Sequence, residues 1–391
     1  MIEAVKNVKS TLRTPLIIFT ISALWIPNNV DGLKKTLLNV YRFVLFTIIL
    51  GINTTAEAIE IFMVWGNMSL TMSSMFLLFT NLSCITKVLN CILRKKEIQA
   101  MIDEVEEELG AVSGEEEKKI VDSGNRVTSI QMNIYFGFSV MSILSLTITP
   151  DEGHLPFRGW YPYDTTKAPG LQLTSAFQCF VVALSAAINI SLDILVSTLI
   201  YQCHSRLQLS ALKLITLCDG VPFNIQGFHS TYDEETVINR LHQCIKQHQA
   251  ALKQARLLQT YFFVPIFFQF SVSMITICVS AYLIAMESNF GNIVSMGSYL
   301  LAMMLQLLLY CYNGNKLLHE SGNVKDAAYQ SQWYKCSVRV RRELLMLMAR
   351  TYRPTRLRAG GITDLSLASF MSIIKASYSF YTVLQQVDEE N

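Results

Sequence analysis

The chain has 391 residues, of which 51% are hydrophobic and only 16% are charged, with 21 Phe and 16 Met. This balance excludes an ordinary soluble domain and indicates a polytopic membrane protein. The formal net charge is only +2, and we expect no nucleic-acid partner. No P-loop, nucleophile elbow or HExxH motif occurs, so we predict no enzyme, no catalytic residue and no cofactor.

Seven long apolar stretches recur along the chain, and each is about as long as the roughly 20 residues that cross a ~30 Å hydrocarbon layer. They cover residues 36–58, 68–93, 129–149, 171–200, 259–286, 293–314 and 365–387. A shorter stretch from Pro15 to Pro27 predicts an interfacial or re-entrant helix, because it cannot span and lacks a signal-peptide cleavage site. We therefore predict an all-α polytopic fold with seven transmembrane helices.

The distribution of Lys and Arg predicts how the chain is threaded, since these residues concentrate in short cytoplasmic loops. With the N-terminus inside, 27 of them lie in the cytoplasmic segments 1–35, 94–128, 201–258 and 315–364. The opposite segments hold only Arg158 and Lys167. This split predicts a cytoplasmic N-terminus and an extracellular C-terminus, the reverse of a G-protein-coupled receptor. Within the spans, we expect Arg42, Lys87 and Lys375 to snorkel to the inner interface.

The outer loops contain one predicted modification site and one predicted cap. Asn67, in "GNMS", is the sequon that we predict to be glycosylated. The second outer loop, "TPDEGHLPFRGWYPYDTTKAPG", combines prolines with aromatic residues. Because proline fixes the backbone and aromatics favour the membrane boundary, we expect an ordered cap that covers a ligand entry path.

The cytoplasmic segments predict helices without metal or disulfide sites. Segment 201–258 predicts two helices that extend spans four and five, separated by the turn "CDGVPFN". His242, Cys244 and His248 fall on different helix faces, which argues against zinc, and we predict no metal site. All nine cysteines lie in spans or cytoplasmic segments, where thiols stay reduced. The acidic runs "DEVEEELG" and "GEEEKK" predict solvated helix ends rather than a calcium site.

Residues 326–352 predict a helix that is too charged to span the membrane. One seam along this helix contains Trp333, Ser337, Val340, Leu344 and Leu347. Its partner is either the protein's own cytoplasmic helices or the equivalent helix of another subunit, in which case the seam anchors an oligomer. The stretch "RPTRLRAGG" then breaks the helix, and Thr363 or Asp364 is the expected N-cap of the seventh span.

The seventh span carries a stripe of mostly small and polar residues along one helix face. The stripe contains Ser369, Ser372, Ala376, Ser379, Val383 and Gln386. It indicates either close helix packing or a water-lined path. In the second case Val383 and Val387 form a constriction that blocks ions by dewetting, with Gln386 beside them. Asp388, Glu389 and Glu390 then surround an outer mouth that favours cations.

The C-terminal stretch "YQSQWYKCSVRVRRELLMLMARTYRPTRLRAGGITDLSLASFMSIIKASYSFYTVL" resembles the signature region of insect odorant receptors. This resemblance implies a ligand-gated, non-selective cation channel of four subunits in the plasma membrane of olfactory sensory neurons. It assigns the gate to Val383, Gln386 and Val387 and the cytoplasmic anchor to 326–352. The chain lacks the co-receptor's long insertion between spans four and five, and its tail "QQVDEEN" differs. It therefore resembles an odorant-tuned subunit that assembles with the co-receptor into a heterotetramer.

The resemblance also implies a ligand site in the outer half of the bundle, between spans two, three, four and six. The Met-rich and aromatic candidates there are Met72, Met75, Phe76, Phe79, Gly137, Phe138, Met141, Phe180, Leu184, Ile188, Met296, Tyr299, Leu300 and Met303. Ordinary packing explains each of them singly. Together they suit a small hydrophobic odorant, a pheromone or a cuticular hydrocarbon, with Tyr299 as a hydrogen-bond partner.

Four regions follow from these assignments. They are a cytoplasmic N-terminus with a short helix (1–35), six spans with the ligand bundle and cytoplasmic extensions (36–325), an anchor helix and turn (326–364), and the pore-lining seventh helix with its tail (365–391). A gustatory receptor channel of the same fold is the nearer alternative function. A metabotropic seven-span receptor is the more distant one, since its chain is threaded the other way.

Overall fold

The computed structural model describes residues 12–26, 32–66, 68–148, 155–165, 167–224, 227–228 and 231–389. The first half of the chain contains α2 (Arg13–Ile21), α3 (Leu33–Phe46), the π-helical turn η1 (Thr47–Ile52), α4 (Asn53–Met63), α5 (Met68–Leu93), α6 (Lys95–Gly110) and α7 (Glu115–Ile148). The second half contains α8 (Gly170–Ile215), β1 (Phe223–Asn224), β2 (Gly227–Phe228), α9 (Thr231–Met286), α10 (Phe290–Gln330), the 3-10 turn η2 (Trp333–Lys335), α11 (Val338–Thr351), β3 (Arg358–Ala359), β4 (Thr363–Asp364) and α12 (Leu367–Glu389).

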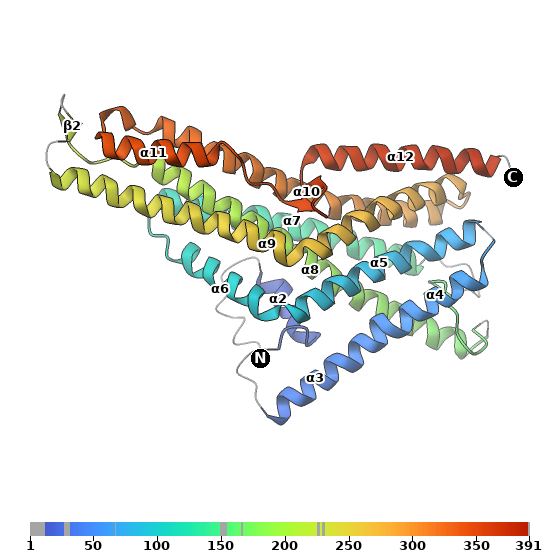
Figure 1. Cartoon of the computed structure of the whole chain (residues 1–391). Coiled ribbons are helices and arrows are strands. Elements are labelled where there is room, and N and C mark those ends of the chain that lie inside the picture. The colour runs from blue at the N-terminus through green and yellow to red at the C-terminus, as the bar shows by residue number, and fades with distance from the viewer. Residues whose placement is uncertain are drawn as a thin grey trace.

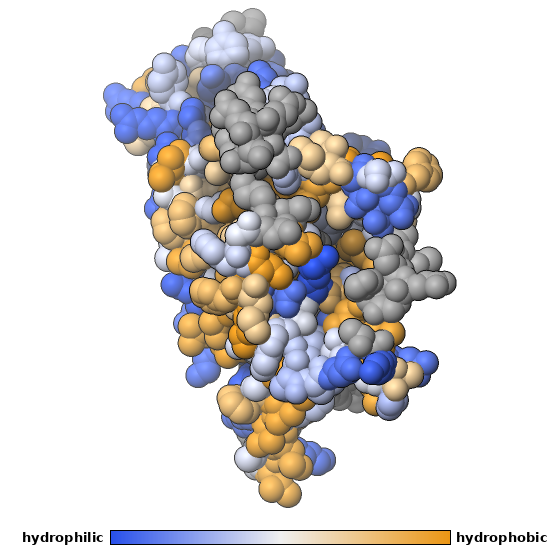
Figure 2. Space-filling view, turned by 90° about the vertical axis from the view of Figure 1, so that its right-hand side faces the viewer, coloured by the Kyte–Doolittle hydropathy of each residue, from blue (hydrophilic) through white to orange (hydrophobic). Residues whose placement is uncertain are grey.

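These elements confirm the predicted all-α polytopic fold. Among the described residues, six helical runs are long and apolar enough to cross a membrane, and the first of them joins α3, η1 and α4 into one run. The 23-residue helix α12 occupies the seventh predicted span. Apolar side chains such as Phe43 and Phe62 are exposed on the outside of the bundle, as expected for contact with lipid. Figure 2 shows such side chains over much of the surface, including the arm at its lower edge.

Three helices are far longer than a bilayer is thick. The 56 residues of α9 extend on the order of 80 Å, against ~30 Å of hydrocarbon. α8 and α10 are 46 and 41 residues long, and all three continue toward α11 at one end of the molecule, whereas α12 lies at the other (Figure 1). The predicted helical extension of spans four and five is thus confirmed, with the β1–β2 hairpin in the connection between them.

The short N-terminal helix α2 is an integral part of the bundle. Leu12, Leu16 and Phe19 are buried in the main hydrophobic core, and α2 packs against α8. Lys95 donates a hydrogen bond to the backbone carbonyl of Ile26 just after this helix. The segment predicted to lie at the interface therefore packs on the protein itself over the residues that the structure describes.

The predicted continuous helix over 326–352 is wrong, because the chain breaks between α10 and α11. Ser337 adopts an extended conformation, and its hydroxyl accepts a hydrogen bond from the Val340 amide (3.4 Å), which starts α11 anew. Trp333 therefore lies in η2, away from the seam of α11. Val340, Leu344 and Leu347 are buried in the main core, so this seam packs on the chain's own helices.

The turn before α12 also differs from the prediction in its cap. Gly360 and Gly361 have positive φ angles of 60° and 72° and form the predicted sharp turn. They lie in the turn that connects β3 and β4 of a small hairpin. Thr363 and Asp364 belong to β4, so neither is the N-cap. The Ser366 hydroxyl instead accepts from the Ser369 amide (3.2 Å) at the start of α12.

The acidic run of α6 is only partly solvated, which corrects the prediction of solvated helix ends. Arg206 of α8 is 1% exposed and forms an ion pair with Glu108 and a longer one with Glu104 (3.7 Å). It also donates to Gln254 of α9 (3.0 Å), so one guanidinium connects α6, α8 and α9. Because a buried guanidinium needs partners for its charge and its donors, these acids are structural rather than free helix ends.

We expect Arg206→Ala to lower the free energy of unfolding by about 2–3 kcal/mol, because Glu108 loses its charge partner and Gln254 a donor. The loss is smaller than for a fully buried pair, since water reaches the partly exposed Glu108. The melting temperature of the detergent-solubilised protein measures it. Lys119→Ala, at a pair whose members are 69% and 71% exposed, is the control and should change stability by less than about 0.5 kcal/mol. Equal effects of the two substitutions would contradict this account.

Candidate functional site

A cavity inside the bundle is lined by helices α5, α7, α8 and α10. It has a volume of about 100 Å³ that the centre of a water molecule can occupy. Its walls are Leu77, Thr80, Asn81, Cys84, Tyr135, Ser139, Ser142, Ile143, Leu146, Phe157, Val182, Ser185, Ala186, Asn189, Ile190, Tyr299, Ala302, Met303 and Gln306. These helices contain the four spans in which the family resemblance places the ligand site. Cavities between bundle helices are frequent ligand sites.

The second outer loop covers one side of this cavity. Phe157 is buried and lines the cavity, and Gln178 of α8 holds its backbone in place. The Gln178 amide accepts from the Phe157 amide (3.3 Å) and donates to the Phe157 carbonyl (2.8 Å) and to the Tyr161 hydroxyl (3.1 Å). The described part of the loop, residues 155–165, is thus fastened to the bundle by a residue that the sequence reading did not single out.

Two of the predicted ligand residues, Tyr299 and Met303, line the cavity. The others that the structure describes do not line it. Ile188, Leu184 and Leu300 pack in or against the main core, and Met72 and Met296 pack on a small cluster of α9 residues. Met75, Phe79 and Phe138 are half-buried, whereas Gly137, Met141 and Phe180 are exposed. The side chain of Phe76 lies outside the described residues. Exposure of Met141 and Phe180 on the bundle surface fits contact with lipid instead.

The cavity is more polar than the sequence reading anticipated. Hydroxyl and amide side chains contribute to every helical wall, among them Ser139 and Ser142 of α7 and Asn189 of α8. Tyr299 and Thr80 share a hydrogen bond of 2.7 Å across the cavity wall. The spacing of polar residues by three or four positions within apolar spans was the signal for this face, since it marks one side of a helix.

A buried ion pair lies beside the cavity. Lys87 Nζ is 2.5 Å from Asp193 Oδ1, and the two side chains are 4% and 1% exposed. The carboxylate also accepts hydrogen bonds from Tyr135 (3.2 Å), Tyr310 (2.7 Å) and Gln306. Lys87 also donates to the side-chain oxygen Oδ1 of Asn189 (2.8 Å). Charges in an apolar interior require this degree of pairing. The prediction that Lys87 snorkels to the interface is therefore wrong, and Asp193 has the partners that its sequence context did not reveal.

A chain of amide hydrogen bonds leads from this ion pair to α9. The oxygen of Gln306 accepts from Gln269 (2.8 Å), which also donates to Ser273 (2.9 Å) and accepts from Ser83 (2.9 Å). One residue further along α9, the Met274 carbonyl accepts from Ser377 of α12 (3.4 Å). The polar network of the cavity thus reaches the helix that packs directly against α12.

The small-residue stripe of α12 is only partly turned away from the rest of the bundle, since its members Ser369 and Ala376 are half-buried. Phe370 and Ile374 pack on the main core, whereas Ser372 and Ser379 are exposed. The predicted gate and mouth side chains of Val383, Gln386, Val387, Asp388, Glu389 and Glu390 lie outside the described residues, as does Asn67. The exposed face of α12 is therefore available to a wet path or to another subunit.

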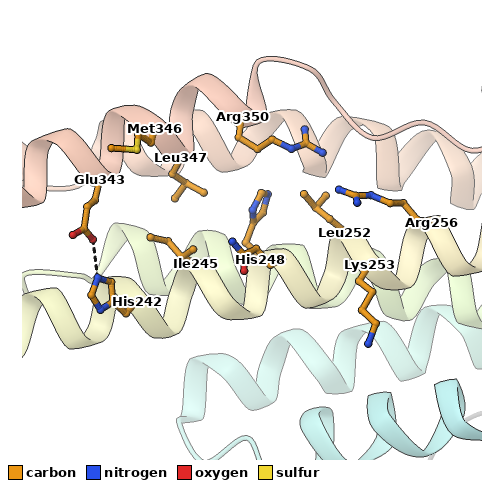
Figure 3. Close-up of a pocket in the computed structure, with 11 residues that line it drawn as sticks. His242, Ile245, His248, Leu252, Lys253, Arg256, Glu343, Met346, Leu347 and Arg350 are labelled. Carbon is orange, nitrogen blue, oxygen red and sulfur yellow. Dashed lines mark ion pairs between the residues drawn. The ribbon is translucent and has the colours of Figure 1, made fainter.

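A groove of about 730 Å³ lies between α9 and α11 (Figure 3). His242 lies 2.9 Å from Glu343, and His248 points toward Arg350. His248 lies outside the predicted spans, and its burial together with the charge of Arg350 lowers the pKa of the imidazole to about 4. No cluster of three metal-ligating side chains occurs among the described residues, so this groove offers no metal centre there.

We expect Asp193→Leu to destabilise the protein by about 3–5 kcal/mol, because Lys87 is then buried without its counterion. Lys87→Met should have a similar effect, because Asp193 is then buried without its counterion. The double variant should recover most of the loss, since no charge is then left buried. Melting temperatures of the three solubilised variants measure this coupling, and simple addition of the two losses would contradict it.

Comparison with known proteins identifies a matching family and several relatives of this chain. A family model described as 7tm Odorant receptor matches residues 67–378. Odorant receptor 46a, isoform A, of Drosophila melanogaster is 24% identical over 328 residues, which cover 82% of this chain and 84% of the relative. Odorant receptor Or1 of Anopheles gambiae is 22% identical, with coverage of 94% and 93%.

The olfactory receptor OR5 from Machilis hrabei, solved in complex with eugenol, has the same fold, with a TM-score of 0.84 at 17% identity over 96% of this chain and 97% of that one. A second structure of the same receptor gives a TM-score of 0.83. Since the family model covers well over half of the sequence, the chain belongs to the insect odorant receptor family, which comprises multi-pass membrane receptors of the ligand-gated channel class.

Proposed function

We propose that this chain is an odorant-tuned subunit of a cation channel that opens when a small ligand enters the cavity between α5, α7, α8 and α10. The observation that carries the proposal is the cavity itself, which four membrane helices line and the Phe157 loop covers. The exposed face of α12 supplies the second requirement, a helix face free to line a path shared with other subunits.

Opening is a shift between two arrangements of the bundle. A ligand favours the open arrangement only to the extent that it binds that arrangement more tightly. The hydrogen bonds from Gln306 through Gln269 to α9, and the contact of α9 with Ser377, connect the cavity to α12. In the open arrangement α12 tilts outward and moves Val383 and Val387 away from the channel axis.

The outer end of α12 forms the gate and the mouth of this channel. Val383 and Val387 block ions by dewetting in the closed arrangement, and Gln386 provides a polar contact beside them. Asp388, Glu389 and Glu390 attract permeant cations by their negative charge. The N-terminus is cytoplasmic and this end of α12 is extracellular, in agreement with the distribution of Lys and Arg.

The co-receptor is the partner in a heterotetramer in the plasma membrane of olfactory sensory neurons. Val340, Leu344 and Leu347 stabilise α11 within its own subunit, which leaves the exposed apolar residues Val338, Leu345 and Met346 for contact with the next one. Asn67 carries a glycan on the first outer loop. Exposed apolar side chains on a charged cytoplasmic helix support an assembly role for this layer.

Cells that express this chain with the co-receptor should show ligand-evoked cation currents that persist under G-protein blockade. Ala302→Phe should abolish them or raise the EC50 at least tenfold, because the added ring occupies the cavity that Ala302 lines. Leu301→Phe, at the neighbouring exposed position, is the matched control and should respond normally. An unchanged dose–response curve for Ala302→Phe, or currents that vanish under G-protein blockade, would overturn the proposal.

Val383→Ala and Val387→Ala should raise the basal current severalfold, because a smaller side chain widens and wets the constriction. Phe370→Ala, on the face that packs on the bundle, serves as a comparison and should instead lower the amount of assembled protein. Currents are recorded without ligand and normalised to surface protein. Basal currents that stay at the wild-type level in both valine variants would remove these residues from the gate.

A further inference from the structure

We infer that the ligand of the cavity is a small oxygenated volatile, such as a ketone, aldehyde, ester or alcohol, whose oxygen accepts hydrogen bonds from Ser139, Ser142 and Asn189. The inference rests on the proposed function, since it concerns the ligand of the same cavity. It narrows the predicted small hydrophobic ligand to one that must carry a hydrogen-bond acceptor.

The size of the cavity favours a small ligand. About 100 Å³ of the cavity is open to the centres of water molecules. Because one water needs ~10–15 Å³ of such volume, the cavity holds on the order of seven to ten waters. A ligand of about ten non-hydrogen atoms matches it. The long chains of cuticular hydrocarbons exceed this space severalfold.

Three polar groups at the cavity wall have no hydrogen-bond partner among the described residues. The hydroxyls of Ser139 and Ser142 belong to side chains that are only 7% and 3% exposed. Serines in helices ordinarily donate to a backbone carbonyl three or four positions earlier, as the nearby Ser191 does to Ala187 (2.7 Å). Because buried polar groups are nearly always satisfied, two unpaired hydroxyls on one cavity wall point to a missing acceptor.

The third group is the amide nitrogen of Asn189, whose side chain is 8% exposed. Its carbonyl oxygen accepts from Lys87 (2.8 Å), and an ammonium group can only donate, so the orientation of the amide is set by the ion pair. The amide nitrogen is left for the cavity that Asn189 lines. Lys87 is thus a positioning residue, and all three groups offer donors to the same space.

The rest of the cavity suits the carbon skeleton of such a molecule. Leu77, Ile143, Leu146, Phe157 and Met303 provide apolar walls, and the hydroxyls of Tyr299 and Thr80 already satisfy one another. In the absence of ligand, water satisfies the three donors. A ligand oxygen replaces that water without loss, whereas a hydrocarbon of the same size leaves the donors unpaired. Sites of this kind discriminate strongly against analogues that lack the hydrogen-bonding group.

The test compares matched ligand sets, namely heptane, 2-heptanone and 2-heptanol, on wild type and on Ser139→Ala/Ser142→Ala, each co-expressed with the co-receptor and normalised to surface protein. In wild type the EC50 of the two oxygenated ligands should be at least tenfold below that of the alkane. In the double variant this ratio should fall about tenfold, through a higher EC50 for the oxygenated ligands. Ser191→Ala, at a buried serine outside the cavity, should leave the ratio unchanged.

The two single variants, Ser139→Ala and Ser142→Ala, keep the comparison available if the double variant fails to reach the surface, and each should give part of the shift. A wild-type response in which heptane equals the oxygenated ligands would overturn the inference while leaving the channel function intact. The same holds for a ratio unchanged by loss of the hydroxyls. Silence toward every ligand of a broad panel, with both chains at the surface, would instead overturn the proposed function and the inference with it.

Discussion

The Lys87–Asp193 ion pair is the constraint on which the membrane bundle depends. Two charges in an apolar interior are tolerated only when each is paired and hydrogen-bonded. Here the partners come from α5, α7, α8 and α10, so one carboxylate fixes the relative positions of four helices. The same four helices line the cavity, and Tyr135, Asn189 and Gln306 belong both to the ion-pair network and to the cavity wall.

An ion pair of this kind is a poor source of stability, because desolvation of the two charges offsets most of their attraction. Its value here is geometric. Lys87 orients the Asn189 amide, and Asp193 holds Tyr135 and Gln306, so the polar side of the cavity is rigid before a ligand arrives. Rigid polar groups lose little entropy on binding, which makes them effective at selecting a ligand by its oxygen. In the proposed complex, apolar contacts would supply the remaining affinity without demanding one orientation.

The sequence predicted the parts of this fold that local patterns determine. Apolar length gave the spans, and the Gly360–Gly361 turn followed from glycine's access to positive φ. The sequence did not predict contacts between distant positions. Hydropathy shows that Lys87 lies in a span, but it does not show that Asp193, 106 positions away, forms an ion pair with Lys87. Choosing mainly Met and aromatic residues as ligand contacts favoured Met141 and Phe180, which are exposed, and passed over Ser139 and Ser142. Met and Phe suit lipid as well as a cavity, so residue type cannot decide which face of a helix is inside.

In the proposed mechanism, the hydrogen bonds of Gln306 connect the ligand cavity to the helices that pack on α12. Its amide nitrogen donates to Asp193 and its oxygen accepts from Gln269, so both ends of one side chain are engaged. A displacement of α10 that breaks one of these bonds leaves a buried polar group unpaired, whereas a concerted movement with α9 keeps both. Movement of the cavity wall is therefore passed to α9 rather than absorbed locally. Because α9 packs against α12 and accepts a hydrogen bond from Ser377, the proposed opening would couple the arrangement of the seventh helix to the cavity through the cost of unsatisfied polar groups.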